Sequence, residues 1–147
     1  MSLEDWLSSG WLTKHKPSPR EIAELFGVAD RDLTDSQTKG LSPDSQLSLA
    51  YNAALQMATA ALAAAGYRAA REAHHYRVIQ SLTYTISAKA DLVAQLDGFR
   101  KKRNISDYER AGAVSAQEAK EMFTLAKTLW KTVTEWLRKN HPELMRK

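Results

Sequence analysis

Hydrophobic residues recur along most of this chain at spacings of three and four positions, which is the period of an amphipathic α-helix. No stretch alternates with a period of two, and no hairpin signal appears, so the pattern predicts helices and no strands. The expected apolar positions, run by run, are Ile22, Leu25, Phe26, Ala29 and Leu33; Leu47, Tyr51, Ala54, Leu55, Ala58 and Leu62; His75, Val78, Ile79, Leu82 and Ile86; Leu92, Leu96 and Phe99; and Ala119, Met122, Phe123, Ala126, Leu129, Trp130, Val133, Trp136 and Leu137.

Start and stop signals divide these runs into separate helices. Ser18 and Ser42 are each followed by proline, which combines an N-cap side chain with a residue suited to the first helical position. Ser18 and Ser115 each have a glutamate three residues later, the pattern of a capping box. Gly66 is expected to end the second run, and Asn140, which precedes His-Pro, to end the last.

The predicted fold is all-α, an up-and-down four-helix bundle with an N-terminal helical appendage. We expect residues 1–40 to form the appendage, its first element holding Trp6 and Trp11, and residues 41–147 to form the bundle. The segment 31–40, RDLTDSQTKG, is interpreted as a hinge between the two. The alanine-rich run is expected at the centre of the bundle, because small side chains let neighbouring helices approach closely.

Composition narrows the class of protein. The chain has 147 residues, 44% of them hydrophobic, which suits one core. It has no cysteine, which excludes disulfides and thiolate metal sites and favours a cytoplasmic protein. The acidic beginning MSLEDWLSS does not resemble a signal peptide, and ALQMATAALAAAG is judged too short and too rich in alanine to span a bilayer, so no membrane is expected. No metal or other cofactor is expected.

Charge is unevenly distributed. Residues 1–50 carry five Lys or Arg against eight Asp or Glu, a net of −3, whereas residues 51–147 carry sixteen against nine, a net of +7. A basic second part suits a polyanionic partner such as nucleic acid, although a solvated surface has the same composition.

The stretch FRKKRNISDY departs from the apolar pattern. Five polar residues would fall within an arc of roughly 140° on one helix, and this arc overlaps the continuation of the stripe that ends at Phe99. These residues are Arg100, Arg103, Asn104, Asp107 and Tyr108. One interpretation is an internal brace between Arg103 and Asp107. The other is an anion pocket in which guanidinium groups bind phosphate, Asn104 donates and accepts hydrogen bonds, and Tyr108 stacks on a base. Lys102 extends the basic patch.

This stretch, together with AYNAALQMATAALAAAGYR and the following HHYRVI, resembles the HEPN superfamily (higher eukaryotes and prokaryotes nucleotide-binding) of helical bundles found in toxin–antitoxin and other prokaryotic conflict systems. The resemblance covers about residues 41–137. In catalytic members, an arginine, a polar residue and a histidine form a metal-independent ribonuclease site, usually paired across a dimer. Arg103 and Asn104 match the first two elements.

The third element differs, because Tyr108 stands after four intervening residues and no histidine lies between His75 and His141. A phenol with a pKa near 10 does not replace an imidazole near 6.5 as an acid and base at neutral pH. The resemblance therefore implies a homodimer that binds RNA or a nucleotide in a toxin–antitoxin-like system, with a nucleotidyltransferase-like protein as a further partner. The alternatives are a ribonuclease in which Tyr108 or His75 assists Arg103, and a non-catalytic adaptor that binds other proteins.

Overall fold

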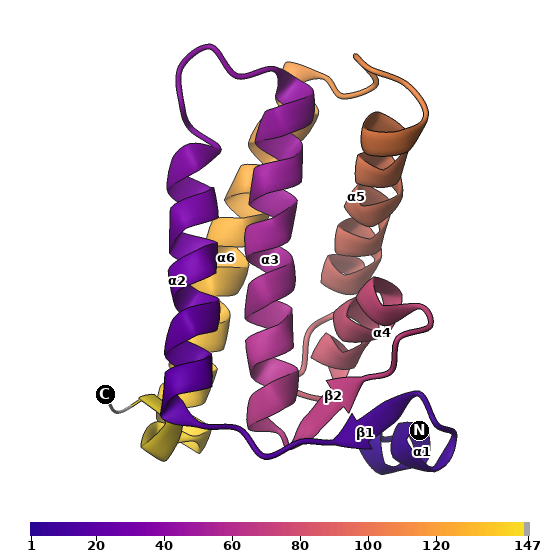
Figure 1. The fold of residues 1–147 in the computed structure, drawn as a ribbon, viewed down its shortest axis with the longest axis vertical. Coiled ribbons are helices and arrows are strands. Elements are labelled where there is room, and N and C mark those ends of the chain that lie inside the picture. The colour runs from indigo at the N-terminus through magenta and orange to yellow at the C-terminus, as the bar shows by residue number, and fades with distance from the viewer. Residues whose placement is uncertain (146–147) are drawn as a thin grey trace.

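The computed structural model describes residues 1–145, and these residues are mostly helical, which confirms the predicted all-α class. Within residues 1–145, six α-helices and two short 3-10 helices are joined by short connections (Figure 1). The α-helices are α1 (Leu3–Ser8), α2 (Pro19–Asp35), α3 (Pro43–Ala64), α4 (His74–Gln80), α5 (Ala90–Tyr108) and α6 (Ala116–Asn140); the 3-10 helices are η1 (Ser81–Thr83) and η2 (Pro142–Met145).

The N-caps and stops lie where the sequence predicts them. The side chains of Ser18, Ser42 and Ser115 each accept a backbone N–H of the first turn, and the capping box at Ser115 is complete. Gly66 follows α3 with a φ of 98°, a left-handed conformation that glycine adopts without steric cost, and α6 ends at Asn140.

The box expected at Ser18 is only half formed. Ser18 Oγ accepts the Glu21 N–H at 3.1 Å, but the Glu21 carboxylate lies 2.8 Å from His15 Nε2. The His15 ring nitrogen competes with the Ser18 backbone N–H for this carboxylate, so Glu21 ties the preceding segment to α2 instead of completing the cap.

Helix α3 is the centre of the protein, as its alanine content predicts. It packs between α2 and α6 along most of its length and touches α5 on a third side (Figure 1). By length and composition alone α3 could cross a membrane, contrary to the sequence expectation, but most of it is buried within the protein, as in the core helix of a soluble protein. Its fully buried small residues are Ala50, Ala53, Ala54, Ala58, Ala60 and Ala61.

Two strands that the sequence did not predict join the N-terminal segment to the chain after α3. Strand β1 (Leu12–Lys14) pairs antiparallel with β2 (Tyr67–Ala69), with Leu12 opposite Ala69. Three residues are too few for a visible alternation, which explains the missed prediction. Trp11 lies after α1 instead of within it, and the Arg77 guanidinium carbon lies 3.6 Å from the centre of its ring.

The predicted hinge 31–40 is helical in its first half. Helix α2 continues to Asp35 because Asp32 is buried there and accepts a hydrogen bond from Asn52 Nδ2 of α3 at 2.6 Å. This contact holds the end of α2 against the central helix.

The run that begins at His75 is not one continuous helix. It forms α4 and then η1, and the buried Ser81 hydroxyl donates to the Val78 carbonyl at 2.6 Å near the break. The expected core residues Val78, Ile79 and Leu82 are nevertheless buried.

Helix α5 is anchored to the core by its first half only. Val93, Leu96 and Phe99 are buried, and the helix persists to Tyr108 without another buried residue. The loop that follows is tied to the start of α3, where the Asp44 carboxylate accepts the N–H groups of Gly112 and Val114 at 2.7 and 3.2 Å. The polar half of α5 is therefore held at both ends.

Replacing Ala58 with leucine is expected to lower the free energy of unfolding by about 1–3 kcal/mol, because a larger side chain has no room on the fully buried central helix. Ala94→Leu on the exposed side of α5 is the matched control and should change stability by no more than about 0.5 kcal/mol. Chemical denaturation measures both variants. Equal losses would contradict the tight packing of α3.

Candidate functional site

An open cavity of about 450 Å³ lies between α4 and the polar half of α5. Its lining residues are Ala73, His74, His75, Tyr76, Arg100 and Asn104. Arg100 and Asn104 are four positions apart and so share one face of α5. Across from them, Ala73 has a φ of 51°, a left-handed turn from which α4 begins. The cavity thus combines a cation, an amide and three ring side chains.

Arg100 is held in place by a neighbour on its own helix. Its Nε donates to Asp97 Oδ1 at 2.7 Å, and Lys101 Nζ lies 3.7 Å from the other oxygen of the same carboxylate. The guanidinium carbon of Arg100 is 5.5 Å from the centre of the Tyr76 ring. Because Asp97 engages only Nε among the hydrogen bonds of residues 1–145, the terminal nitrogens of Arg100 remain available to a ligand.

Arg103 does not line the cavity; its guanidinium carbon lies 5.6 Å from the centre of the Tyr51 ring of α3, and the side chain is only partly engaged. Its Nε is 2.9 Å from Asp107 Oδ2, yet the Nε–H is not directed at this oxygen, so the pair is an ion pair without a good hydrogen bond. Nη1 donates to Asn104 Oδ1 at 3.4 Å, and Ser48 Oγ of α3 donates to Asp107 at 2.9 Å. The side chain of Arg103 is 23% exposed. Arg103 and Asp107 therefore form the brace considered from the sequence, although the guanidinium is not sealed inside the protein.

Two titratable rings lie beside Arg103. The Tyr51 hydroxyl is buried without a hydrogen-bond partner in the described structure, and burial raises the pKa of Tyr51 to about 12, although Arg103 opposes this change. The His75 ring centre lies 6.2 Å from that of Tyr51. Burial lowers the pKa of His75 from its ordinary value, and the charges of Arg103, His74 and Arg100 lower it further. His75 is therefore a neutral imidazole at pH 7.

The remaining predicted residues do not join the cavity. Lys102 points towards α6, where its Nζ lies 3.3 Å from Glu118 Oε2. The Ser115 N–H lowers the pKa of Glu118, and Lys102 adds to this effect. Tyr108 is 76% exposed at the end of α5. The structure thus brings Arg100, Asn104 and His75 together around the cavity, pairs Arg103 with Asp107 outside its lining, and separates Lys102 and Tyr108 from it.

Sequence reasoning missed Tyr76 and assigned no role to His74. The sequence did contain a signal for Tyr76, because this residue lies outside the apolar helix face that contains Val78 and Ile79. Adjacent helical residues point in different directions, and the His74 and His75 ring centres are 6.1 Å apart. Within residues 1–145, no group of three or more His, Cys, Asp or Glu could hold a metal ion.

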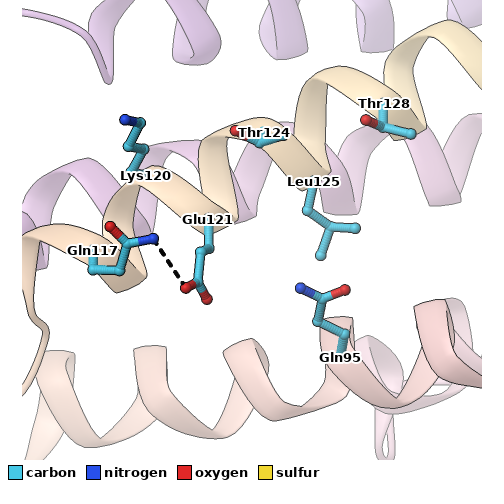
Figure 2. A pocket seen from close by; sticks show the side chains of 7 residues that line it. All are labelled: Gln95, Gln117, Lys120, Glu121, Thr124, Leu125 and Thr128. Atoms are coloured by element: carbon cyan, nitrogen blue, oxygen red, sulfur yellow. Dashed lines mark hydrogen bonds between the residues drawn. The ribbon is translucent and has the colours of Figure 1, made fainter.

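A second hollow of about 370 Å³ lies between α5 and α6, away from these residues (Figure 2). Gln95 of α5 faces α6, and Gln117 Nε2 donates to Glu121 Oε1 at 3.2 Å. The other lining residues are Lys120, Thr124, Leu125 and Thr128. This hollow has no concentration of positive charge or aromatic rings, so the cavity between α4 and α5 is the stronger candidate site.

Comparison with protein-family models and with curated proteins found no match for this chain. Support for the candidate site therefore comes from the geometry and chemistry of its residues alone.

The wild-type protein is expected to lose stability as the pH falls below about 6.5, because the unfolded chain protonates His75 more readily than the folded protein does. Because the pKa of His75 is lower in the folded protein, the neutral His75 contributes to the free energy of unfolding at pH values above the ordinary histidine pKa. This contribution is lost as the pH falls towards the pKa of His75 in the folded protein. His75→Gln should lose less stability on acidification, measured by denaturation at several pH values. His141→Gln, at the end of α6, is the control; an unchanged acid loss in His75→Gln would contradict the assignment.

Proposed function

We propose that this chain is a HEPN-type protein, an up-and-down four-helix bundle with an N-terminal helical appendage, that binds RNA or a nucleotide in the cavity between α4 and α5. The observation that supports this proposal most is the convergence of Arg100 and Asn104 with three ring side chains around one open space. The guanidinium group, the amide and the rings each suit a different portion of a nucleotide.

Phosphate recognition falls to Arg100. A guanidinium group presents its N–H donors in a planar fork that matches phosphate oxygens, and the contact with Asp97 holds the side chain in position while leaving its terminal nitrogens available. The excess of positive charge in residues 51–147 favours approach of a polyanion. Asn104 supplies an amide that both donates and accepts hydrogen bonds, as base edges and ribose hydroxyls require.

The HEPN resemblance extends the proposal beyond the single chain. It implies a cytoplasmic homodimer within a prokaryotic toxin–antitoxin-like system, with a nucleotidyltransferase-like protein as a partner. The degenerate motif around Arg103 favours binding over cleavage, because Tyr108 occupies the position of the expected histidine.

Arg100→Ala is expected to weaken RNA binding roughly 10- to 150-fold, since a hydrogen bond to a charged group contributes about 1.5–3 kcal/mol. It should also reduce the salt dependence of binding, because one phosphate contact is lost. Fluorescence anisotropy with a labelled single-stranded oligonucleotide at several salt concentrations measures both effects. Arg20→Ala, on the exposed face of α2, is the matched control; equal affinities for the two variants would refute the site.

A second candidate function is a metal-independent ribonuclease, and the position of His75 favours it. A neutral imidazole in the cavity could take the proton of a ribose 2′-hydroxyl while its oxygen bonds to the adjacent phosphorus. The bond from phosphorus to the 5′-oxygen would break, and water would protonate the leaving oxygen. Arg100 and Arg103 would stabilise the charge on the phosphate oxygens. In this reading His75, instead of the exposed Tyr108, assists Arg103.

If the protein is a ribonuclease, His75→Gln is expected to reduce cleavage of labelled RNA by at least about 100-fold, the lower range for loss of an acid–base group. Arg103→Ala is expected to reduce it by about 100-fold or more, the range for loss of one group that stabilises charge in the transition state. Tyr108→Phe should cleave at the wild-type rate. Gel analysis of end-labelled RNA measures these rates. Equal cleavage by wild type, His75→Gln and Arg103→Ala would exclude this site as the source of the cleavage and leave binding as its proposed function.

A further inference from the structure

The side chain of Tyr76 is unusual because it is both aromatic and exposed. Within residues 1–145, the large hydrophobic residues exposed to this degree are Met1, Tyr76 and Tyr108, and only Tyr76 lines the cavity. Tyr76 is 36% exposed and lines the cavity. An aromatic ring left in solvent beside cations is a typical platform for a nucleic-acid base.

The surroundings of Tyr76 fix its position. The guanidinium carbons of Arg77 and Arg100 each lie over its ring, 5.5 Å from the ring centre and within the range of cation–π contacts, which restrains the ring. Arg77 is itself held 3.6 Å from the Trp11 ring, and the next residues of α4, Val78 and Ile79, are buried in the core. The platform is therefore ordered before a ligand arrives, which lowers the entropy cost of binding.

We propose that Tyr76 is the base-stacking residue of the site and that the cavity accepts one unpaired nucleotide of single-stranded RNA. The base stacks on Tyr76, its edge or its ribose bonds Asn104, and its phosphate binds Arg100. This assignment rests on the function proposed above and specifies its ligand.

The arrangement discriminates between forms of nucleic acid. A base within a duplex is covered on both faces by its neighbours, so it cannot stack on Tyr76, whereas an unpaired base can be turned out of the strand. The cavity volume of about 450 Å³ lies within the roughly 300–1,000 Å³ of ordinary small-molecule sites. Single-stranded RNA and a free nucleotide share this chemistry, but the basic character of residues 51–147 favours a strand with further phosphates.

Tyr76→Leu keeps an apolar side chain of helix-favouring type but removes the aromatic face. It is expected to weaken binding of a labelled single-stranded RNA roughly 5- to 150-fold, the range for one lost stacking contact. Tyr76→Phe and Tyr76→Trp keep an aromatic face and should bind within about threefold of wild type or more tightly. Tyr108→Leu, the matched exposed tyrosine outside the cavity, should bind as wild type does. Fluorescence anisotropy measures all four variants, and circular dichroism checks their folding.

The binding data on these variants separate failure of the stacking role of Tyr76 from failure of the proposed function. Unchanged affinity of Tyr76→Leu together with weak binding by Arg100→Ala would overturn the stacking role but leave the proposed function intact. If Tyr76→Leu does not fold, Tyr76→Trp decides, and binding weaker than that of Tyr76→Phe by tenfold or more would overturn the proposal. If neither Tyr76→Leu nor Arg100→Ala alters RNA binding, the proposed function itself fails.

Competition with unlabelled ligands distinguishes single-stranded RNA from a free nucleotide as the molecule that the cavity binds. Unlabelled single-stranded RNA should displace the probe at concentrations where a duplex of the same sequence, a nucleoside monophosphate and inorganic phosphate do not. Displacement by the monophosphate as effective as that by the strand would overturn the assignment to single-stranded RNA and indicate a free nucleotide. Equal displacement by inorganic phosphate would overturn base recognition altogether.

Discussion

The close packing of α2 and α6 on the alanine-rich α3 determines where the rest of the chain can go. Fully buried alanines such as Ala54 and Ala58 let helix backbones approach, so these three helices form the solid part of the core. Helix α5 packs mainly on α3 and α4 and makes little contact with α6. Open space therefore remains on both sides of α5, and the side towards α4 is the one lined by cationic and aromatic groups.

The electrostatics of the candidate site are locally balanced. Asp97 neutralises Arg100, and Asp107 lies beside Arg103 while accepting a hydrogen bond from Ser48. These carboxylates offset the cost of placing two guanidinium groups near the buried phenol of Tyr51. Under the proposed function, a phosphate that binds the terminal nitrogens of Arg100 would share this cation with Asp97, which favours ligands that add stacking to charge.

The sequence predicted the helices well because their signals are local. The serine caps, Gly66 and the three-and-four spacing each depend on neighbours within one or two turns. The strands, the end of α2 and the composition of the cavity depend on long-range contacts, such as Leu12 with Ala69 and Asp32 with Asn52. The polar arc on α5 included two residues that line the cavity, Arg100 and Asn104, whereas the place of Tyr76 in the cavity depends on the contact between α4 and α5.

The pairing of β1 with β2 has a mechanical consequence. Strand β2 leads into the turn at Ala73 from which the ring side chains of the cavity project, and β1 leads back to Trp11, which holds Arg77. One wall of the cavity is thus braced by the beginning of the chain, while the other belongs to α5, which packs on both α3 and α4. Fraying of the first residues would remove the contact between Trp11 and Arg77 that supports α4, so under the proposed function binding in the cavity would depend on order at the start of the chain.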